Sequence, residues 1–133
     1  MATHARGTFE VKVTPQAQEE NVGDPTVNRL SLDKQFHGDL QASSKGQMLA
    51  VGSGSKGSSA GYVALERVIG TLQGRTGTFA LQHSGTMTNG VPRLTITVVP
   101  GSGTGELAGL SGNMTVIIAD GRHSFDFEYS LAE

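Results

Sequence analysis

The feature that most constrains the fold is a series of three two-residue turns in an alternating chain. Gln73-Gly74, Asn89-Gly90 and Asp120-Gly121 each separate two runs in which apolar and polar residues alternate. Asn-Gly and Asp-Gly are favoured sequences for the type I′ turn that joins two antiparallel strands. In such a hairpin the flanking residues pair, so each further pair follows by counting outward. The sequence therefore predicts consecutive β-hairpins of known register.

This register places apolar residues opposite one another on a shared sheet face. Counting outward from the three turns gives these pairs: Val68–Phe79, Glu66–Leu81, Ala64–His83, His83–Ile96, Leu81–Val98, Ile118–His123, Val116–Phe125 and Met114–Phe127. No slip of register is needed to keep the apolar rows together. Turn chemistry and hydrophobic patterning therefore point to the same pairing, which supports both.

Further strands precede the three hairpins. Residues 8–14 and 27–37 alternate, Pro15 ends the first run, and a return strand is expected over residues 40–51. The total is about eight strands joined mostly by short loops, and closure of such a meander removes its exposed edges. We predict an all-β fold with one domain over residues 1–133, a small antiparallel eight-stranded β-barrel of meander topology. An open sandwich is the alternative.

Composition excludes several classes of partner and chemistry. The net charge is −2 and the pI is near 6.1, which argues against nucleic acid or an anionic membrane as the main partner. The chain has no Cys, hence no disulfide framework and no thiol nucleophile. No apolar run approaches the length of a membrane helix, and the first residues hold no apolar signal core. We therefore expect a cytoplasmic protein.

Ionisable residues fall on the otherwise apolar face. The hairpin register places Glu66, His83 and His123 there, and alternation in residues 27–37 adds Lys34. Such groups form either a satisfied structural network or a ligand site. Burial would raise the pKa of the Glu66 carboxyl unless a cation holds it ionised, and Lys34 is the candidate cation. Tyr62 and Arg75 share this face.

If the set is a functional site, a Glu with a neighbouring His suits proton abstraction and return. Glu66 would be the general base or acid and His83 its partner, while Lys34 or Arg75 would stabilise developing negative charge. The candidate substrate-binding residues are Tyr62, Arg75, Phe79, Leu81, Ile96, Val98, His123, Phe125 and Phe127. A structural network is the main alternative. Metal binding by Glu66, His83 and His123 is a minor one, and we expect neither a metal nor a cofactor.

Two loops and one outer row of side chains allow two interpretations each. Residues 101–112 suggest a phosphate loop but lack its Gly-Lys-Ser/Thr ending, so a turn that plugs one barrel end is favoured. Residues 52–59 are either a plain connector or a lid. Val63, Leu65 and Ile69 point outward yet are apolar, so either a loop or terminal segment or a second subunit is expected to cover them.

Four blocks of sequence resemble a bacterial family of unknown function. They are residues 31–40 (SLDKQFHGDL), 62–70 (YVALERVIG), 74–85 (GRTGTFALQHSG) and 103–112 (GTGELAGLSG), and the similarity extends over residues 7–131. The resemblance implies a small antiparallel barrel like that of allene oxide cyclases, plant dirigent proteins and some spirotetronate cyclases. Those proteins bind apolar substrates in the barrel and steer cyclisation or coupling, and many are dimers or trimers.

No catalytic motif of those enzymes matches this chain residue by residue. The expected function is binding of a small, largely apolar organic molecule in the barrel, with cofactor-independent cyclase or isomerase chemistry. The alternative is a non-enzymatic binding or structural barrel whose Lys-Glu-His set is a buried network. The expected assembly is a homo-oligomer, a dimer or a trimer.

Overall fold

The computed structural model describes residues 2–17, 21–52 and 57–131. The described chain forms eight long strands and one short one. They are β1 Thr3–Pro15, β2 Asn28–Gly38, β3 Leu40–Gly52, β4 Ala60–Leu72, β5 Arg75–Thr88, β6 Val91–Val98, β7 Thr104–Gly105, β8 Leu110–Ala119 and β9 Arg122–Leu131. Alternating burial along these strands shows why they form, since each has one face toward the interior and one toward water.

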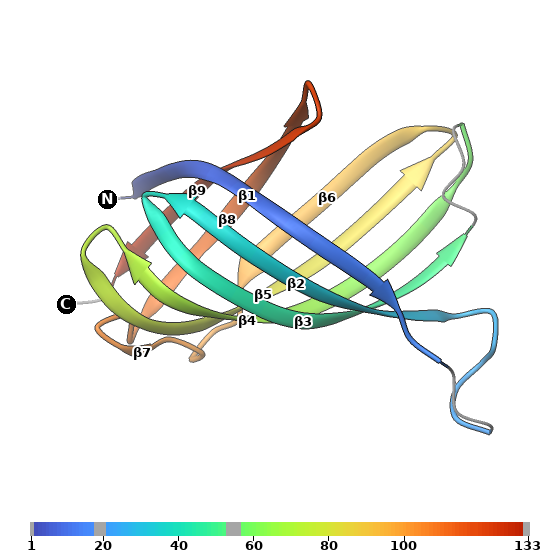
Figure 1. Ribbon diagram of the computed structural model, residues 1–133, viewed down its shortest axis with the longest axis horizontal. Coiled ribbons are helices and arrows are strands. Elements are labelled where there is room, and N and C mark those ends of the chain that lie inside the picture. The colour runs from blue at the N-terminus through green and yellow to red at the C-terminus, as the bar shows by residue number, and fades with distance from the viewer. Residues whose placement is uncertain (1, 18–20, 53–56, 132–133) are drawn as a thin grey trace.

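The eight long strands close into one antiparallel barrel (Figure 1). Their order is β4-β3-β2-β1-β9-β8-β6-β5, and the pairing of β4 with β5 completes the ring. The two-residue strand β7 adds to β5 beside this ring. The predicted eight-stranded meander barrel is confirmed, and the open sandwich is not what forms.

The predicted register is confirmed at all eight pairs. Val68 pairs with Phe79, His83 with Ile96, and Met114 with Phe127, and the other five pairs also match. Both residues of each turn have positive φ, as a type I′ turn requires. The turn sequences therefore fix the register within β4, β5 and β6 and, separately, between β8 and β9.

The first strand begins earlier than predicted. The alternation indicated residues 8–14, whereas β1 starts at Thr3 and pairs with β9 from Thr3↔Tyr129 to Phe9↔His123. The inward positions of this extension are Ala5 and Gly7, whose small side chains give no hydrophobic signal. A Cβ on Gly7 would lie 1.9 Å from the His37 carbonyl oxygen, so only Gly fits this close approach. This extension joins the first strand to the last and so closes the barrel.

Large side chains fill the barrel at one end, here called the base. The base carries the Gln73-Gly74 turn and the start of β1, while the opposite end, the mouth, carries the Asn89-Gly90 turn. Phe79 stacks on Phe127 with ring centroids 5.8 Å apart, and Phe127 also stacks on Tyr129. Leu107 in the turn after β7 is fully buried. The turn within residues 101–112 therefore plugs the base, as predicted.

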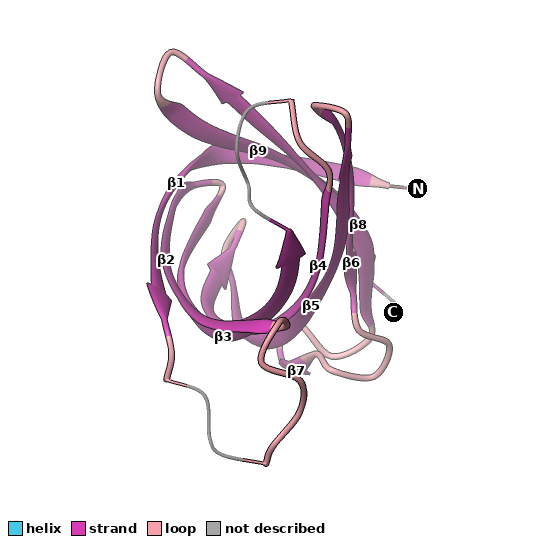
Figure 2. Ribbon diagram, turned by 90° about the vertical axis from the view of Figure 1, so that its right-hand side faces the viewer, coloured by secondary structure: helices cyan, strands magenta, loops and turns pink. Residues whose placement is uncertain are grey.

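The barrel wall is incomplete toward the mouth. Strands β6 and β8 share only the pair Thr97↔Asn113, and β1 pairs with β9 only as far as Phe9. Beyond these points the β8–β9 hairpin bends away from the barrel axis, as Figure 2 shows from the mouth. The mouth is therefore walled by β1 to β6 alone.

The outward apolar row is exposed. Val63, Leu65 and Ile69 are 53%, 57% and 57% exposed, so none of the described residues covers them. A subunit interface there stays a prediction. In the described part of the chain, no helix has the length and apolar character needed to cross a bilayer.

Candidate functional site

Four neighbouring strands bring a polar network together inside the barrel. The Glu66 carboxylate accepts three hydrogen bonds: from Lys34 Nζ at 2.8 Å and His83 Nε2 at 2.5 Å on Oε2, and from Ser44 Oγ at 2.7 Å on Oε1. All four residues are buried. Lys34, the candidate cation, therefore contacts Glu66, which the sequence left open, and His83 contacts the same carboxylate.

Strand register explains this convergence. Lys34 on β2 pairs with Ser44 on β3, and Glu66 on β4 pairs with Gly46 on β3. A Cβ on Gly46 would lie 2.7 Å from the Cα and the Cβ of Glu66. Because Gly46 has no side chain, Glu66 can occupy the space beside it. Ser44 was missed in the sequence, although alternation along β3 places it on the inner face.

The environment keeps Glu66 ionised. Burial alone would raise the pKa of this carboxyl, but the hydrogen bond from His83 and the charge of Lys34 outweigh it and lower the pKa from 4.5 to about 2. The Lys34 ammonium also lies 5.2 Å from the centre of the Phe9 ring and 5.8 Å from that of Phe36. The cation predicted to hold Glu66 charged is thus present.

Acid is expected to destabilise the fold through Glu66. The folded-state pKa of Glu66, about 2, is below its ordinary 4.5, so the stabilisation is complete above pH 4.5 and is lost as pH falls through 2. The difference corresponds to roughly 3 kcal/mol. Urea unfolding of the wild type should show the free energy of unfolding fall by this amount between pH 6 and pH 2. The Glu66→Gln variant should lack this part of the fall.

A control separates this effect from general acid sensitivity. The exposed Asp126 carboxyl also has a lowered pKa, mainly because of its hydrogen bond from His4. In Asp126→Asn the free energy of unfolding should fall with pH nearly as much as in the wild type. Water screens the charge of Asp126, so this carboxyl contributes little to the pH dependence. An equal decline in wild type and Glu66→Gln would rule out Glu66 as its source.

A pocket of about 780 Å³ occupies the mouth, next to the polar network. Its walls come from β1 to β6 and their loops, and none of its lining residues belongs to β8 or β9. The apolar lining side chains include Leu30, Met48, Ala50, Met87 and Leu94. Two cations, Arg29 and Arg93, line it and no described acidic residue does. Both the volume and the apolar walls are typical of small-molecule sites.

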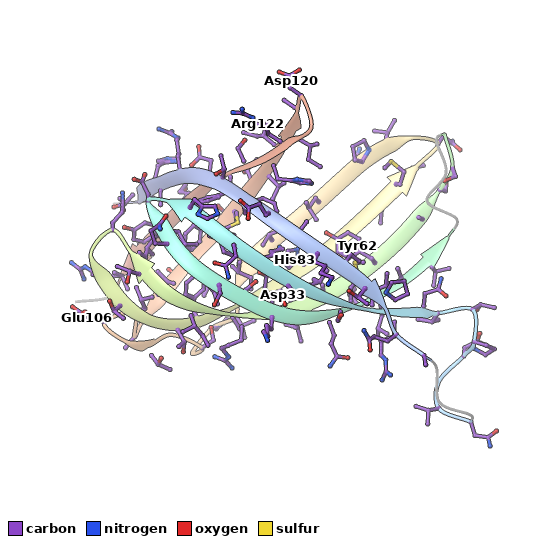
Figure 3. The ribbon with its side chains drawn as sticks, viewed as in Figure 1. Asp33, Tyr62, His83, Glu106, Asp120 and Arg122 are labelled. Atoms are coloured by element: carbon purple, nitrogen blue, oxygen red, sulfur yellow. The ribbon has the colours of Figure 1, made fainter. Side chains whose placement is uncertain are left out.

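Tyr62 links the pocket to the network. Its side chain lines the pocket, and its ring centroid lies 6.4 Å from that of His83. Figure 3 places both residues inside the barrel, with Tyr62 nearer the mouth. A Cβ on Gly85 would lie 2.3 Å from the Tyr62 ring, so the ring rests on Gly85. Burial raises the pKa of Tyr62, and the nearby Glu66 carboxylate raises it further.

Two candidate residues lie apart from this arrangement. Arg75 is exposed beside the Gln73-Gly74 turn at the base, the end opposite the pocket. His123 is half-buried and lies against Phe9, with ring centroids 5.2 Å apart. It lines a second hollow of about 420 Å³ between β1 and the β8–β9 turn. Neither residue contacts Glu66.

The other six candidate residues belong to the packed core. They are Phe79, Leu81, Ile96, Val98, Phe125 and Phe127. None of them lines the pocket at the mouth. The structure shows these side chains packed in the core. Their contact with a ligand stays a prediction.

The described residues hold no group of three or more His, Asp, Glu or Cys side chains that could bind a metal ion. His123 lies beyond Phe9, so it does not join Glu66 and His83. Most of the loop predicted as a connector or lid over residues 52–59 lies outside the described residues, which omit 53–56. Gly57 and Ser58, which follow the gap, line the pocket.

Comparison with known proteins assigns a family. A family described as "Protein of unknown function (DUF3224)" matches residues 5–129. The chain belongs to the DUF3224 family. This DUF3224 protein is also similar to a solved structure from Shewanella oneidensis MR-1, described as a protein of unknown function from the same family.

The similarity to the Shewanella DUF3224 protein extends over the whole fold. The two chains are 45% identical, the match covers 100% of each, and the TM-score is 0.88. A search of curated proteins found no match. Membership in DUF3224 thus confirms the resemblance to a family of unknown function and leaves the activity to be argued from the site.

Proposed function

We propose that this protein binds a small, largely apolar organic molecule in the pocket at the mouth. The observation that carries the proposal is the pocket volume of about 780 Å³ with its apolar walls. Tyr62 lines this pocket and lies next to the buried charged network. Binding sites of this kind combine apolar walls with a few polar groups that orient the ligand. The predicted likeness to allene oxide cyclases and dirigent proteins is consistent with this proposal and stays a prediction.

Binding is expected to depend on the space around Ala50, which lines the pocket and pairs with Tyr62. Ala50→Trp would place an indole ring in that space. We expect the fluorescent dye anilinonaphthalene sulfonate to bind the wild type and to bind this variant at least about tenfold more weakly, a loss of roughly 1.4 kcal/mol. Fluorescence titration measures both affinities.

The control variant is Gln47→Trp, on the exposed outer face of the same strand. It adds the same ring outside the barrel and should bind the dye as the wild type does. Equal dye affinity in all three proteins would contradict the proposed pocket. Native mass spectrometry of protein purified from its own host is the complementary test, and a co-purifying organic molecule lost from Ala50→Trp would identify the ligand.

The second candidate function is cofactor-independent isomerisation or cyclisation of the bound molecule. The hydrogen bond between His83 and Glu66, close to the pocket, favours it, because such pairs transfer protons in many enzymes. Its rival is a binding or structural barrel in which the same network only stabilises the fold. A homo-oligomeric assembly and a cytoplasmic location stay predictions.

A further inference from the structure

His83 carries its proton on a defined nitrogen. Glu66 is ionised at neutral pH and an ionised carboxylate only accepts hydrogen bonds, so Nε2 of His83 must be the donor in the 2.5 Å contact. In the neutral imidazole the other nitrogen, Nδ1, is therefore an unprotonated acceptor. This is the arrangement in which a carboxylate orients a histidine that acts as a base through its second nitrogen.

Nδ1 of His83 is not completely buried, although the residue as a whole is only 5% exposed. It forms no hydrogen bond with another described residue, yet no fully buried side-chain nitrogen or oxygen in the described chain lacks a partner. Because Nδ1 has no such partner, it must keep some exposed surface. The groups around His83 are Glu66 and Tyr62 on β4, Lys34 and Ser44 behind Glu66, and the apolar Ile96 on β6. Tyr62 is the neighbour of His83 that lines the pocket at the mouth.

Glu66 itself is poorly suited to be the base. Its two oxygens already accept three hydrogen bonds, its side chain has no exposed surface, and its low pKa makes it a weak proton acceptor. Lys34 is occupied by the same carboxylate. These contacts favour Glu66 as a positioning residue and His83 as the reactive one, whereas the sequence suggested Glu66 as the base or acid and His83 as its partner.

Tyr62 supplies a hydrogen-bond donor on a ring whose centroid lies 6.4 Å from that of His83. Its hydroxyl forms no hydrogen bond with another described residue, and its raised pKa keeps it protonated at neutral pH. A donor next to a base is the combination that stabilises an oxyanion formed by proton removal.

Resting on the proposed binding function, we propose that Nδ1 of His83 removes a proton from carbon in the bound molecule and that Tyr62 stabilises the resulting oxyanion. The substrate class is a largely apolar β,γ-unsaturated carbonyl compound, whose acidic C–H lies between the carbonyl and its C=C bond. The C–H electron pair forms a C=C bond while the carbonyl π pair moves to oxygen, giving an enolate. The imidazolium then returns the proton to another carbon of the conjugated enolate, so a double bond migrates with no net change in composition.

A nitrobenzisoxazole is a suitable probe because its decomposition needs only a base. Removal of its ring C–H proton breaks the N–O bond and forms a nitrile and a coloured phenolate, the oxyanion that Tyr62 would stabilise. We expect the wild type to accelerate this reaction with saturation. His83→Gln should be slower by about 100-fold or more and Tyr62→Phe by about tenfold.

The matched control is His37→Gln, since His37 is exposed and its Nε2 lies 3.1 Å from Oε1 of the exposed Glu10. It should react at the wild-type rate. A wild type no faster than the same concentration of free imidazole, or a His83→Gln variant as fast as the wild type, overturns the proposal. If dye binding is intact in such a protein, the binding function stands and only the proton-transfer role fails; if dye binding is absent, both fail.

Nitrogen NMR of the wild type provides a test that requires no variant to fold. The spectrum should show His83 with its proton on Nε2 and an unprotonated Nδ1. A proton on Nδ1 of the neutral ring would overturn the role assigned to Glu66. In Glu66→Gln the preference between the two tautomers should weaken, and the rate of nitrobenzisoxazole decomposition at saturating probe should fall with it.

Discussion

Replacing Glu66 with glutamine is expected to reduce the free energy of unfolding by about 3–5 kcal/mol at neutral pH. The change leaves the Lys34 ammonium, whose side chain is only 8% exposed, without its counter-charge. An unpaired buried charge costs much more than its pairing gains. Urea unfolding monitored by circular dichroism measures the loss.

A double-mutant cycle with Lys34→Met tests the cause. Lys34→Met should be less costly in the Glu66→Gln background than alone, because the charge it removes is then already unpaired. Additive effects would show that the two side chains act independently. A Glu66→Gln variant as stable as the wild type would contradict this prediction, because Lys34 would then lose its counter-charge without a cost in stability.

Phe127→Ala is expected to destabilise the barrel by about 3–5 kcal/mol and to leave dye binding at the mouth intact. Phe127 is fully buried between Phe79 and Tyr129, so the substitution leaves a cavity at the base. Thermal or urea unfolding gives the stability, and fluorescence titration gives the affinity.

The comparison variant is Ile118→Ala, on the same sheet but 69% exposed. It should change stability by less than about 0.5 kcal/mol. Should Phe127→Ala keep wild-type stability and alter dye affinity, the side chain would be a pocket wall, as the sequence suggested, and the assignment of the base as packed core would be wrong.

Much of the fold could be predicted because the hairpins are local. Each two-residue turn sets its own register, so pairs such as Ala64–His83 follow without any knowledge of distant strands. The pairing of β1 with β9 could not be predicted in this way. It joins residues more than one hundred positions apart through inward-facing Ala5 and Gly7, which carry no hydrophobic pattern.

The network was predictable and the pocket was not. Alternation places Lys34, Glu66 and His83 on the inner face, and their charges single them out. The pocket lies at the end of the barrel that large inner side chains do not fill. Small inner residues near the Asn89-Gly90 turn, namely Ala50, Ala60 and Gly85, are the signal that could have located it.

The first strand begins and the last strand ends side by side at the base (Figure 1), as Thr3↔Tyr129 shows. The pocket opens at the other end of the barrel. A tag, a fused domain or a surface linker joined at either end therefore emerges away from the mouth. The protein can be immobilised through either end, or linked head to tail through a short peptide, with the route to Tyr62 unobstructed.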